Sequence, residues 1–238
     1  MFIKKYVMVK KIVILQSNYI PWKGYFDIMN MADEFIFYDD VQYTKNDWRN
    51  RNKILTQNGT QWLTLPVRQK RLSQLIKDTK IENKRWAKKH WESLQQNYSK
   101  AQYFNKYKEI FEMAFMSCNE EYLSKINYKF ILTINKILGI KTKMRSCSEF
   151  NKIIAGPNER LVEICKECEA NVYLSGPSAK NYLNEDMFSK NNIKVEWMNY
   201  DNYPEYKQLF KPFNYNVTVL DLIFNEGDNA TKFMKSFN

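Results

Sequence analysis

Two adjacent carboxylates, Asp39 and Asp40, follow the apolar run FIFY and are the first candidates for acid–base chemistry. A carboxylate at the end of a strand can act as a general base or hold Mg²⁺ through water. Successive side chains of a strand point to opposite faces, so the pair cannot reach one reacting atom without a bulge. We predict both as catalytic candidates and prefer Asp40, which is nearer the polar segment that follows, while Asp39 mainly affects stability.

His90 is the one histidine of the chain and the third catalytic candidate. Its ordinary pKa lies near neutrality, which suits a general base. It follows Trp86 by one helical turn, and no partner for it is visible in the sequence. A structural or orienting histidine is therefore the alternative.

Polar and aromatic side chains crowd two segments, 16–26 and 42–52. Aromatic rings suit stacking on a sugar or base, and Lys and Arg suit phosphate or carboxylate groups. A surface loop with solvated charges is the alternative, since most loop charges have no function. The predicted substrate-binding residues are Gln16, Asn18, Tyr19, Trp22, Gly24, Tyr25, Gln42, Lys45, Trp48, Asn50, Arg51, Asn52, Ser175 and Gly176.

The four cysteines point to no metal site and to no disulfide framework. Cys165 and Cys168 form a CxxC pair, but they fall on the apolar face of a predicted helix, without a second pair or a nearby histidine. Cys147 is a weak candidate nucleophile because no base lies near it in the sequence. The Walker and GxGxxG motifs are both missing, which argues against P-loop nucleotide hydrolysis and typical dinucleotide binding. Any cofactor stays unknown.

Two apolar runs, 11–16 and 33–40, predict buried strands, and the segment between them predicts a loop that enters a helix. This spacing is the size of a βαβ unit, whose strands are parallel. Ligands of open α/β sheets bind beyond the carboxyl ends of the strands. We therefore expect one cleft lined by the residues that follow both strands: Gln16, Asn18, Asp39 and Asp40.

The rest of the chain completes an α/β pattern with few glycines and prolines. The segment 41–54 predicts a long loop or hairpin. Further strands are predicted at 61–67, 142–146, 170–176 and 193–200, a helix at 160–169, and helices through 73–138. The expected fold is a mostly parallel, Rossmann-like sheet with a helical insertion. The expected division is an N-terminal βαβ half with the site loops (1–72), the helical insertion (73–140), and a C-terminal α/β half that completes the same domain (141–238).

The formal net charge is +11, and twelve Lys or Arg against three Asp or Glu fall within 68–108. Such a stretch attracts anions, and nucleic acid is one candidate partner. The alternative is a composition rich in Lys, Asn and Ile that carries no function there. No run of about 18 apolar residues predicts a membrane span, and the apolar run after the opening lysines is too short for a secretion signal. We expect a cytoplasmic protein.

Two groups of residues are similar to signature motifs of the WbqC-like family, found in bacterial O-antigen and capsule gene clusters. The first is Gln16, Asn18, Tyr19, Pro21, Trp22, Gly24, Tyr25 and Phe26; the second is Asp39, Asp40, Gln42, Lys45, Trp48, Asn50, Arg51 and Asn52. Further matches extend the resemblance over nearly the whole chain. It implies a transferase that modifies a nucleotide-linked amino sugar, by acyl or aminoacyl transfer, with a nucleotide-sugar or another phosphorylated small molecule as partner.

A weaker likeness in layout is to the HxGH nucleotidylyltransferases. Gly24 matches the glycine of that motif, whereas Trp22 and Tyr25 stand where it has histidines. The likeness implies a nucleotide phosphate near the start of the helix, but the residues that stabilise phosphoryl transfer are missing. The alternatives are thus a nucleotidylyltransferase-like enzyme, a tRNA-binding module that uses the basic stretch, and a non-catalytic scaffold.

Overall fold

The computed structural model describes residues 9–151 and 156–237, which form two compact units interleaved along the chain. The first unit takes the residues up to 15 together with 28–38 and 142–199. The second unit takes 16–27, 39–141 and 200–238. The predicted boundaries after 72 and 140 divide the chain differently, into consecutive segments. None of the helices among the described residues is long and apolar enough to cross a membrane.

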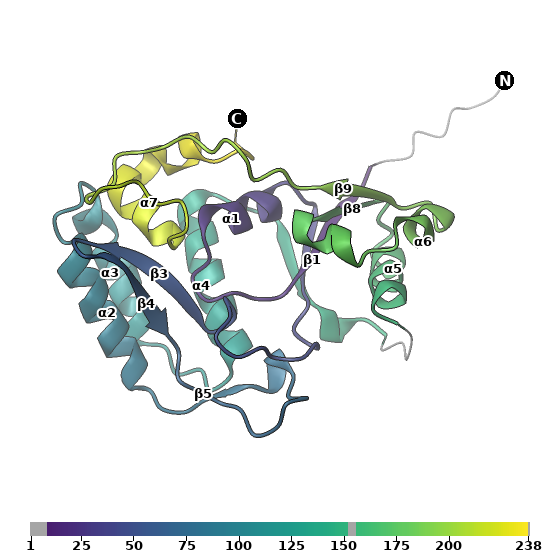
Figure 1. Ribbon diagram of the computed structural model, residues 1–238, viewed down its shortest axis with the longest axis horizontal. Coiled ribbons are helices and arrows are strands. Elements are labelled where there is room, and N and C mark those ends of the chain that lie inside the picture. Colours follow the sequence, from purple (N-terminus) through teal and green to yellow (C-terminus); the bar gives the residue numbers. More distant parts are fainter. Residues whose placement is uncertain (1–8, 152–155, 238) are drawn as a thin grey trace. The chain divides into compact units, whose positions relative to one another are not determined.

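The first unit is built on a five-stranded sheet in which every neighbouring pair is parallel. The strand order is β7-β2-β1-β8-β9, so β1 is central (Figure 1). The bounds are β1 Lys11–Leu15, β2 Glu34–Phe37, β7 Lys143–Ser146, β8 Val172–Ser175 and β9 Lys194–Trp197. β2 is buried along its whole length, as expected for a strand covered on both faces. The predicted α/β class with a parallel sheet is confirmed.

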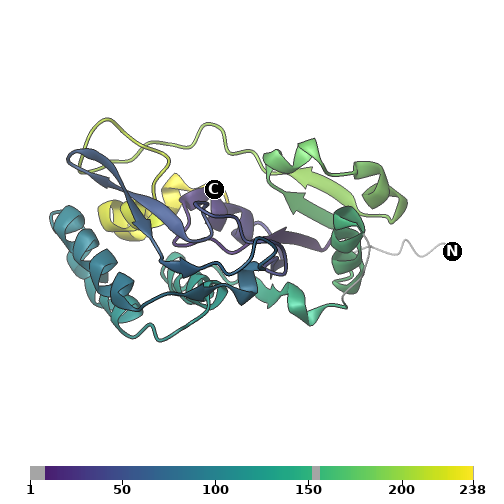
Figure 2. The ribbon, with the colours of Figure 1, turned by 60° about the horizontal axis from the view of Figure 1, so that its bottom comes forward.

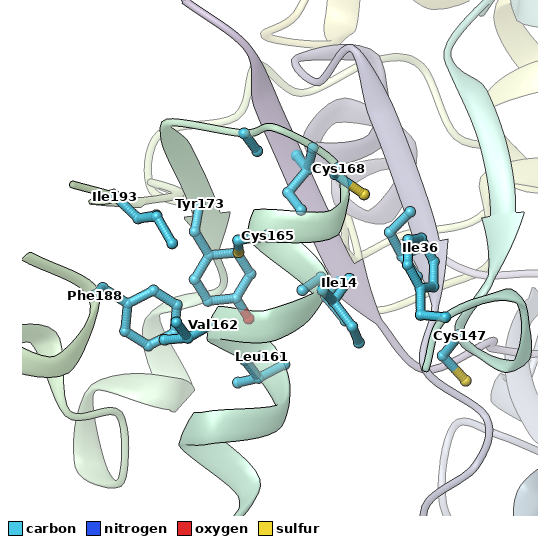
Figure 3. Close-up of a cluster of buried hydrophobic side chains, with 14 residues drawn as sticks. Ile14, Ile36, Cys147, Leu161, Val162, Cys165, Cys168, Tyr173, Phe188 and Ile193 are labelled. Atoms are coloured by element: carbon cyan, nitrogen blue, oxygen red, sulfur yellow. The ribbon is translucent and has the colours of Figure 1, made fainter. Parts of the chain in front are cut away.

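The helices α5 (Pro157–Glu167) and α6 (Glu185–Lys190) belong to the first unit. The helix α1 (Lys23–Asn30) begins in the second unit and ends in the first. The apolar face of α5 packs on β1 and β8 in a cluster that includes Ile14, Leu161, Tyr173 and Phe188 (Figure 3). Tyr173 and Phe188 stack with ring centroids 5.2 Å apart. Apolar burial and aromatic stacking therefore hold this unit together.

The CxxC pair lies in this apolar cluster, where Figure 3 shows Cys165 between Tyr173 and Ile14. Burial raises the pKa of the Cys165 thiol far above its usual range and that of Cys168 to about 11. Both thiols stay protonated near neutral pH and pack as small apolar groups. Among residues 9–151 and 156–237, no group of three or more His, Cys, Asp or Glu side chains is placed to hold a metal ion.

The second unit joins two antiparallel strand pairs to a group of helices. Its elements are β3 Arg51–Thr56, β4 Gly59–Thr64, β5 Val67–Arg68, β6 Lys80–Ile81, α2 Arg85–Tyr98, α3 Phe104–Met116, α4 Leu123–Leu138 and α7 Val219–Glu226. The β3–β4 hairpin contacts α2, and α3 contacts both α2 and α7. Figure 2 shows the hairpin as a long twisted ribbon beside these helices. Short 3₁₀ turns complete the chain at η1 Ile76–Asp78, η2 Cys147–Glu149, η3 Pro177–Asn181 and η4 Gly227–Phe233.

α4 shows why the helical segment folds as it does. Its buried residues recur at helical spacing and include Ile126, Phe130 and Ile134. It ends where Gly139 adopts a left-handed conformation, with φ of 73°. Glycine is the usual residue at such an end because it has no Cβ to clash.

The strands predicted at 11–16, 33–40, 61–67, 142–146, 170–176 and 193–200 all correspond to observed strands, with ends shifted by a few residues. The helices predicted from residue 73 begin only at Arg85, because η1 and β6 occupy the preceding residues. The loop or hairpin predicted at 41–54 contains the start of β3. The helices α6 and α7 were not predicted.

Candidate functional site

The second unit contains a hollow of about 240 Å³ that we call the amide–indole hollow. Its lining residues are Asn18, Pro21, Trp22, Trp48, Asn52 and Asn216. They provide three carboxamides, two indole rings and one proline, and none of them is charged. The hollow therefore offers hydrogen-bonding groups and aromatic faces to a neutral polar ligand.

One wall of the hollow is the loop that follows β1, and its backbone is strained at Ile20. The φ of Ile20 is 41°, a left-handed conformation that β-branched residues rarely adopt. Such strain costs on the order of 1–3 kcal/mol and persists only where the surroundings enforce it. The Asn52 amide enforces it here, since its Nδ2 donates to the carbonyls of Tyr19 at 3.2 Å and Ile20 at 2.7 Å. Asn52 therefore shapes the loop as well as lining the hollow.

Arg49 fixes the orientation of Asn18 in this wall. Its Nη1 donates to Asn18 Oδ1 at 3.2 Å, and its Nη2 donates to Gln16 Oε1. The Asn18 oxygen is thereby occupied, which leaves Nδ2 as the group that Asn18 can offer to a ligand. Arg49 also lies 3.6 Å from the Asp47 carboxylate. The guanidinium thus organises the start of the loop.

Trp22 forms the second wall and packs over the start of α1. A Cβ at Gly24 would lie 2.4 Å from the Trp22 ring, so only glycine leaves room for the indole there. On its other sides the ring meets Tyr200 and Tyr203, with centroids 5.2 and 5.7 Å away. The likeness to nucleotidylyltransferases attributes Gly24 to phosphate approach, whereas in this structure the glycine accommodates an indole of its own chain.

Asp39 and Asp40 follow β2, which ends at Phe37. Of the four residues expected to line one cleft (Gln16, Asn18, Asp39 and Asp40), Asn18 alone lines the hollow. Asp39 is only 5% exposed and accepts a hydrogen bond from the Ser17 backbone N–H at 2.8 Å. Burial raises the pKa of Asp39 to about 6, although the hydrogen bonds from Ser17 and the charge of Arg49 act in the other direction. Asp40 is half-buried. This asymmetry agrees with the predicted difference between the two carboxylates; their chemical roles remain predictions.

His90 and Tyr19 both belong to a buried aromatic core, which favours the alternative of a structural or orienting histidine. Tyr19 is fully buried, and its hydroxyl lies 2.8 Å from His90 Nδ1. Trp86 and Phe130 meet the Tyr19 ring edge-on, with centroids 6.1 and 5.8 Å away. Burial lowers the pKa of His90 to about 4, despite a hydrogen bond to the backbone of Thr64. A neutral, enclosed imidazole positions Tyr19 and cannot meet a substrate.

Several other predicted site residues have structural contacts. The Tyr25 hydroxyl donates to the Gln16 carbonyl at 3.1 Å, and Asn50 Nδ2 donates to the Leu65 carbonyl at 3.0 Å. Both side chains are buried, so they shape the loops and do not face a ligand.

The remaining predicted residues lie outside the lining of the hollow. Gln42 and Lys45 are exposed. Arg51 lies on β3 over the Trp62 ring. Ser175 and Gly176 belong to the first unit, where Ser175 ends β8.

Three residues of the site are absent from the predicted binding residues. Asn216 was not considered, Pro21 appeared only in the first signature motif, and Arg49 only as one of the cations of the segment 42–52. Arg49 stands in the run WRNRN beside the predicted Arg51, but its partners Gln16 and Asn18 lie more than 30 residues away. Asn216 comes from a polar segment near the end of the chain that has no periodic signal. Pairing across such distances is not written in local sequence patterns.

Comparison with known proteins gives a match along most of the chain. The profile described as the WbqC-like protein family matches residues 16–233, which include every lining residue of the amide–indole hollow. The uncharacterized protein Rv1507c of Mycobacterium tuberculosis is 43% identical over 227 residues, or 95% of this chain and 98% of that protein. No solved structure gives a significant match to the chain.

Proposed function

Because the chain belongs to the WbqC-like protein family, we propose that it is a transferase that modifies a nucleotide-linked amino sugar for surface-polysaccharide synthesis, by acyl or aminoacyl transfer. The substrate class is supported by the site itself. The reaction type is supported by the O-antigen and capsule gene clusters in which this family is found, which is an association and not a feature of the site.

The observation that carries the proposal is the composition of the amide–indole hollow. A pyranose ring presents hydroxyls at its edge and C–H groups on its faces. Carboxamides such as Asn18 and Asn216 can bond the hydroxyls, and the Trp22 and Trp48 rings can cover the C–H faces. At about 240 Å³ the hollow is smaller than the ~300–1,000 Å³ of pockets for drug-sized ligands. It suits one sugar ring, with the rest of the substrate outside.

The proposed chemistry assigns the proton to a carboxylate. Acyl transfer to an amino sugar needs the neutral amine, which attacks the acyl carbon while the bond to the leaving group breaks. A general base takes the proton that the amine loses. Asp40 suits this role better than Asp39, because Asp40 is half-buried and Asp39 is enclosed against Ser17.

Thermal-shift measurements with a panel of nucleotide sugars, free amino sugars, ATP and CTP test the proposal. A ligand at about 100-fold its Kd should add about 2.7 kcal/mol of stability. Asn18→Ala and Trp48→Ala should remove the shift, whereas Tyr182→Ala, an exposed aromatic of the first unit, should keep it. With a substrate identified, Asp40→Asn should lower turnover about 10²-fold or more. Binding that is indifferent to Asn18 and Trp48 would refute the assignment of the sugar to this hollow.

Nucleic acid is the alternative partner, and the exposed lysines and arginines of 68–108 favour it. One hollow in that region, of about 250 Å³, carries both signs of charge. It is lined by Arg68, Lys80, Ile81, Glu82, Asn83, Lys84, Glu120 and Glu121. Binding of tRNA that falls steeply with added salt, without any response to nucleotide sugars, would favour this alternative.

A further inference from the structure

Two cations on β3 lie over one exposed indole of β4. The guanidinium carbon of Arg51 is 4.1 Å from the Trp62 ring centroid, and the Lys53 ammonium is 4.8 Å from it. The strand register places Lys53 directly opposite Trp62. Trp62 is 39% exposed, so this group, which we call the cation–indole face, meets solvent. Cation–π attraction holds both positive charges at one place on the hairpin.

The cation–indole face is continuous with the amide–indole hollow through Trp48. Trp48 lines the hollow, and its ring centroid lies 5.5 Å from that of Trp62. Asn52, another lining residue, stands between Arg51 and Lys53 in β3 and therefore points to the opposite face of the strand, so Trp48 is the residue that connects the hollow with the cation–indole face. A ligand whose ring occupied the hollow could therefore extend along the indoles toward the two cations.

No carboxylate of the described residues lies within ion-pair distance of Arg51 or Lys53. Some other cations that lie over aromatic rings have such partners, whereas Lys180, over the Trp197 ring, has none among the described residues. Lys80 lies 4.7 Å from the Tyr122 ring centroid but also 3.1 Å from Glu121, and Lys106, 5.5 Å from the Tyr107 ring centroid, also pairs with Asp228. The cation–indole face thus lacks the neutralising carboxylate found beside Lys80 and Lys106, and it differs from Lys180 in that two cations share one ring.

Donors without acceptors accumulate at the same place. Arg51 Nε is buried without a hydrogen-bond partner in the described structure, and so is the hydroxyl of Tyr43. The two groups are close enough that the charge of Arg51 opposes the rise of the Tyr43 pKa, which burial brings to about 12. Buried polar groups normally find partners, and unsatisfied ones call for an explanation such as a missing ligand. An acceptor that carries negative charge would match the guanidinium and the ammonium of the cation–indole face.

We propose that Arg51 and Lys53 form an anion subsite that holds the diphosphate of the substrate whose sugar ring occupies the amide–indole hollow. The subsite rests on the proposed function for the identity of the sugar, but not for the binding of the anion. A guanidinium bonds phosphate oxygens in a fork, and the ammonium adds a point charge beside it. Arg51 and Lys53 thereby select phosphorylated sugars over free sugars.

Isothermal titration with UDP-N-acetylglucosamine, UDP, pyrophosphate and free N-acetylglucosamine tests the subsite. Arg51→Gln and Lys53→Gln should each weaken binding of the three phosphorylated probes about tenfold or more and reduce its dependence on salt. Lys180→Gln is the matched control, because Lys180 also lies over an indole ring, that of Trp197, but belongs to the first unit. Its affinities should equal those of the unaltered protein.

Melting temperatures of the variants separate lost binding from lost folding. If Arg51→Gln unfolds, Arg51→Lys and Lys53→Gln carry the test. Equal affinity of Arg51→Gln, Lys53→Gln and Lys180→Gln for the phosphorylated probes overturns the subsite. No measurable binding of UDP or pyrophosphate to the unaltered protein at millimolar concentration overturns it as well.

The same titrations distinguish failure of the subsite from failure of the proposed function. If UDP-N-acetylglucosamine and UDP bind equally, Asn18→Ala changes neither, and Arg51→Gln weakens both, the sugar assignment fails and the anion subsite stands. If Asn18→Ala abolishes binding of the nucleotide sugar while Arg51→Gln leaves it unchanged, the subsite fails and the sugar assignment stands.

Discussion

The two units differ in how completely they satisfy their own polar groups. In the first unit the buried cluster around Cys165 and Tyr173 is apolar and stacked. Among the described residues, some buried polar side-chain atoms have no hydrogen-bond partner. All of these atoms belong to the second unit. The strained φ of Ile20 lies there too. Natural chains break local folding rules mainly where function requires it. The difference therefore points to the second unit as the part of the molecule that binds a ligand.

Two tryptophans of the second unit differ in burial, and substitution of the buried one gives the largest expected change in the free energy of unfolding. Trp86 is buried against Tyr19, His90 and Phe115, whereas Trp48 is 41% exposed. Trp86→Ala should lower the free energy of unfolding by about 3–5 kcal/mol. Trp48→Ala should change it by less than about 1 kcal/mol while removing ligand binding. Urea unfolding of both variants measures this, and equal losses would show that Trp48 is part of the core.

The buried carboxylate gives a pH-dependent effect of intermediate size. The unfolded Asp39 loses its proton near pH 4 and the folded one near pH 6, so the folded state binds more protons between these values. The free energy of unfolding therefore falls as pH rises through this window, by up to about 3 kcal/mol from this group. Asp39→Asn should abolish that contribution, because an amide oxygen can still accept the Ser17 N–H and carries no charge.

The measurement is the difference in unfolding free energy between Asp39→Asn and the unaltered protein at pH 4–8. His90, whose pKa is lowered to about 4, makes stability rise with pH in the same range, but both proteins share this term and it cancels. A difference that stays constant with pH would mean that Asp39 titrates normally.

The smallest expected effect is that of Gly24→Ala, which should change the shape of the hollow without changing the stability of the fold. Gly24→Ala places a Cβ 2.4 Å from the Trp22 ring, which must move. We expect binding of the nucleotide sugar to weaken about tenfold, or ~1.4 kcal/mol, with little change in melting temperature. Gly156→Ala is the matched control, since its Cβ meets only the flexible end of Glu159. Unchanged affinity of Gly24→Ala would show that the Trp22 wall does not contact the ligand.

The regular elements could be predicted from sequence because burial leaves a periodic trace. Apolar runs identified β1, β2 and β8, and with them the places where Gln16, Asp39 and Ser175 follow or end a strand. The parallel order then followed from the size of the crossover. These features depend on residues close together in the chain.

The side-chain orientations in the irregular loops could not be predicted. Successive side chains point to opposite faces only in an extended strand, so sequence position does not tell which side a loop residue faces. Asn18 and Tyr19 are neighbours, yet one lines the hollow and the other is enclosed with His90. Asn52 reads as a polar loop residue, but it is buried and bonds the carbonyls that hold Ile20 in its strained conformation. Which side of such a loop faces a ligand is decided by partners from distant parts of the chain.

The interleaving of the two units limits the ways in which the gene can be rearranged during evolution. The chain passes from one unit to the other five times, after residues 15, 27, 38, 141 and 199. No contiguous stretch of gene therefore encodes either unit by itself. A single boundary placed between residues 16 and 199, by gene fusion or by expression of a fragment, would divide both units. We therefore expect the sheet and the site to evolve together, with new ligand specificity arising by substitution of residues and not by exchange of whole units.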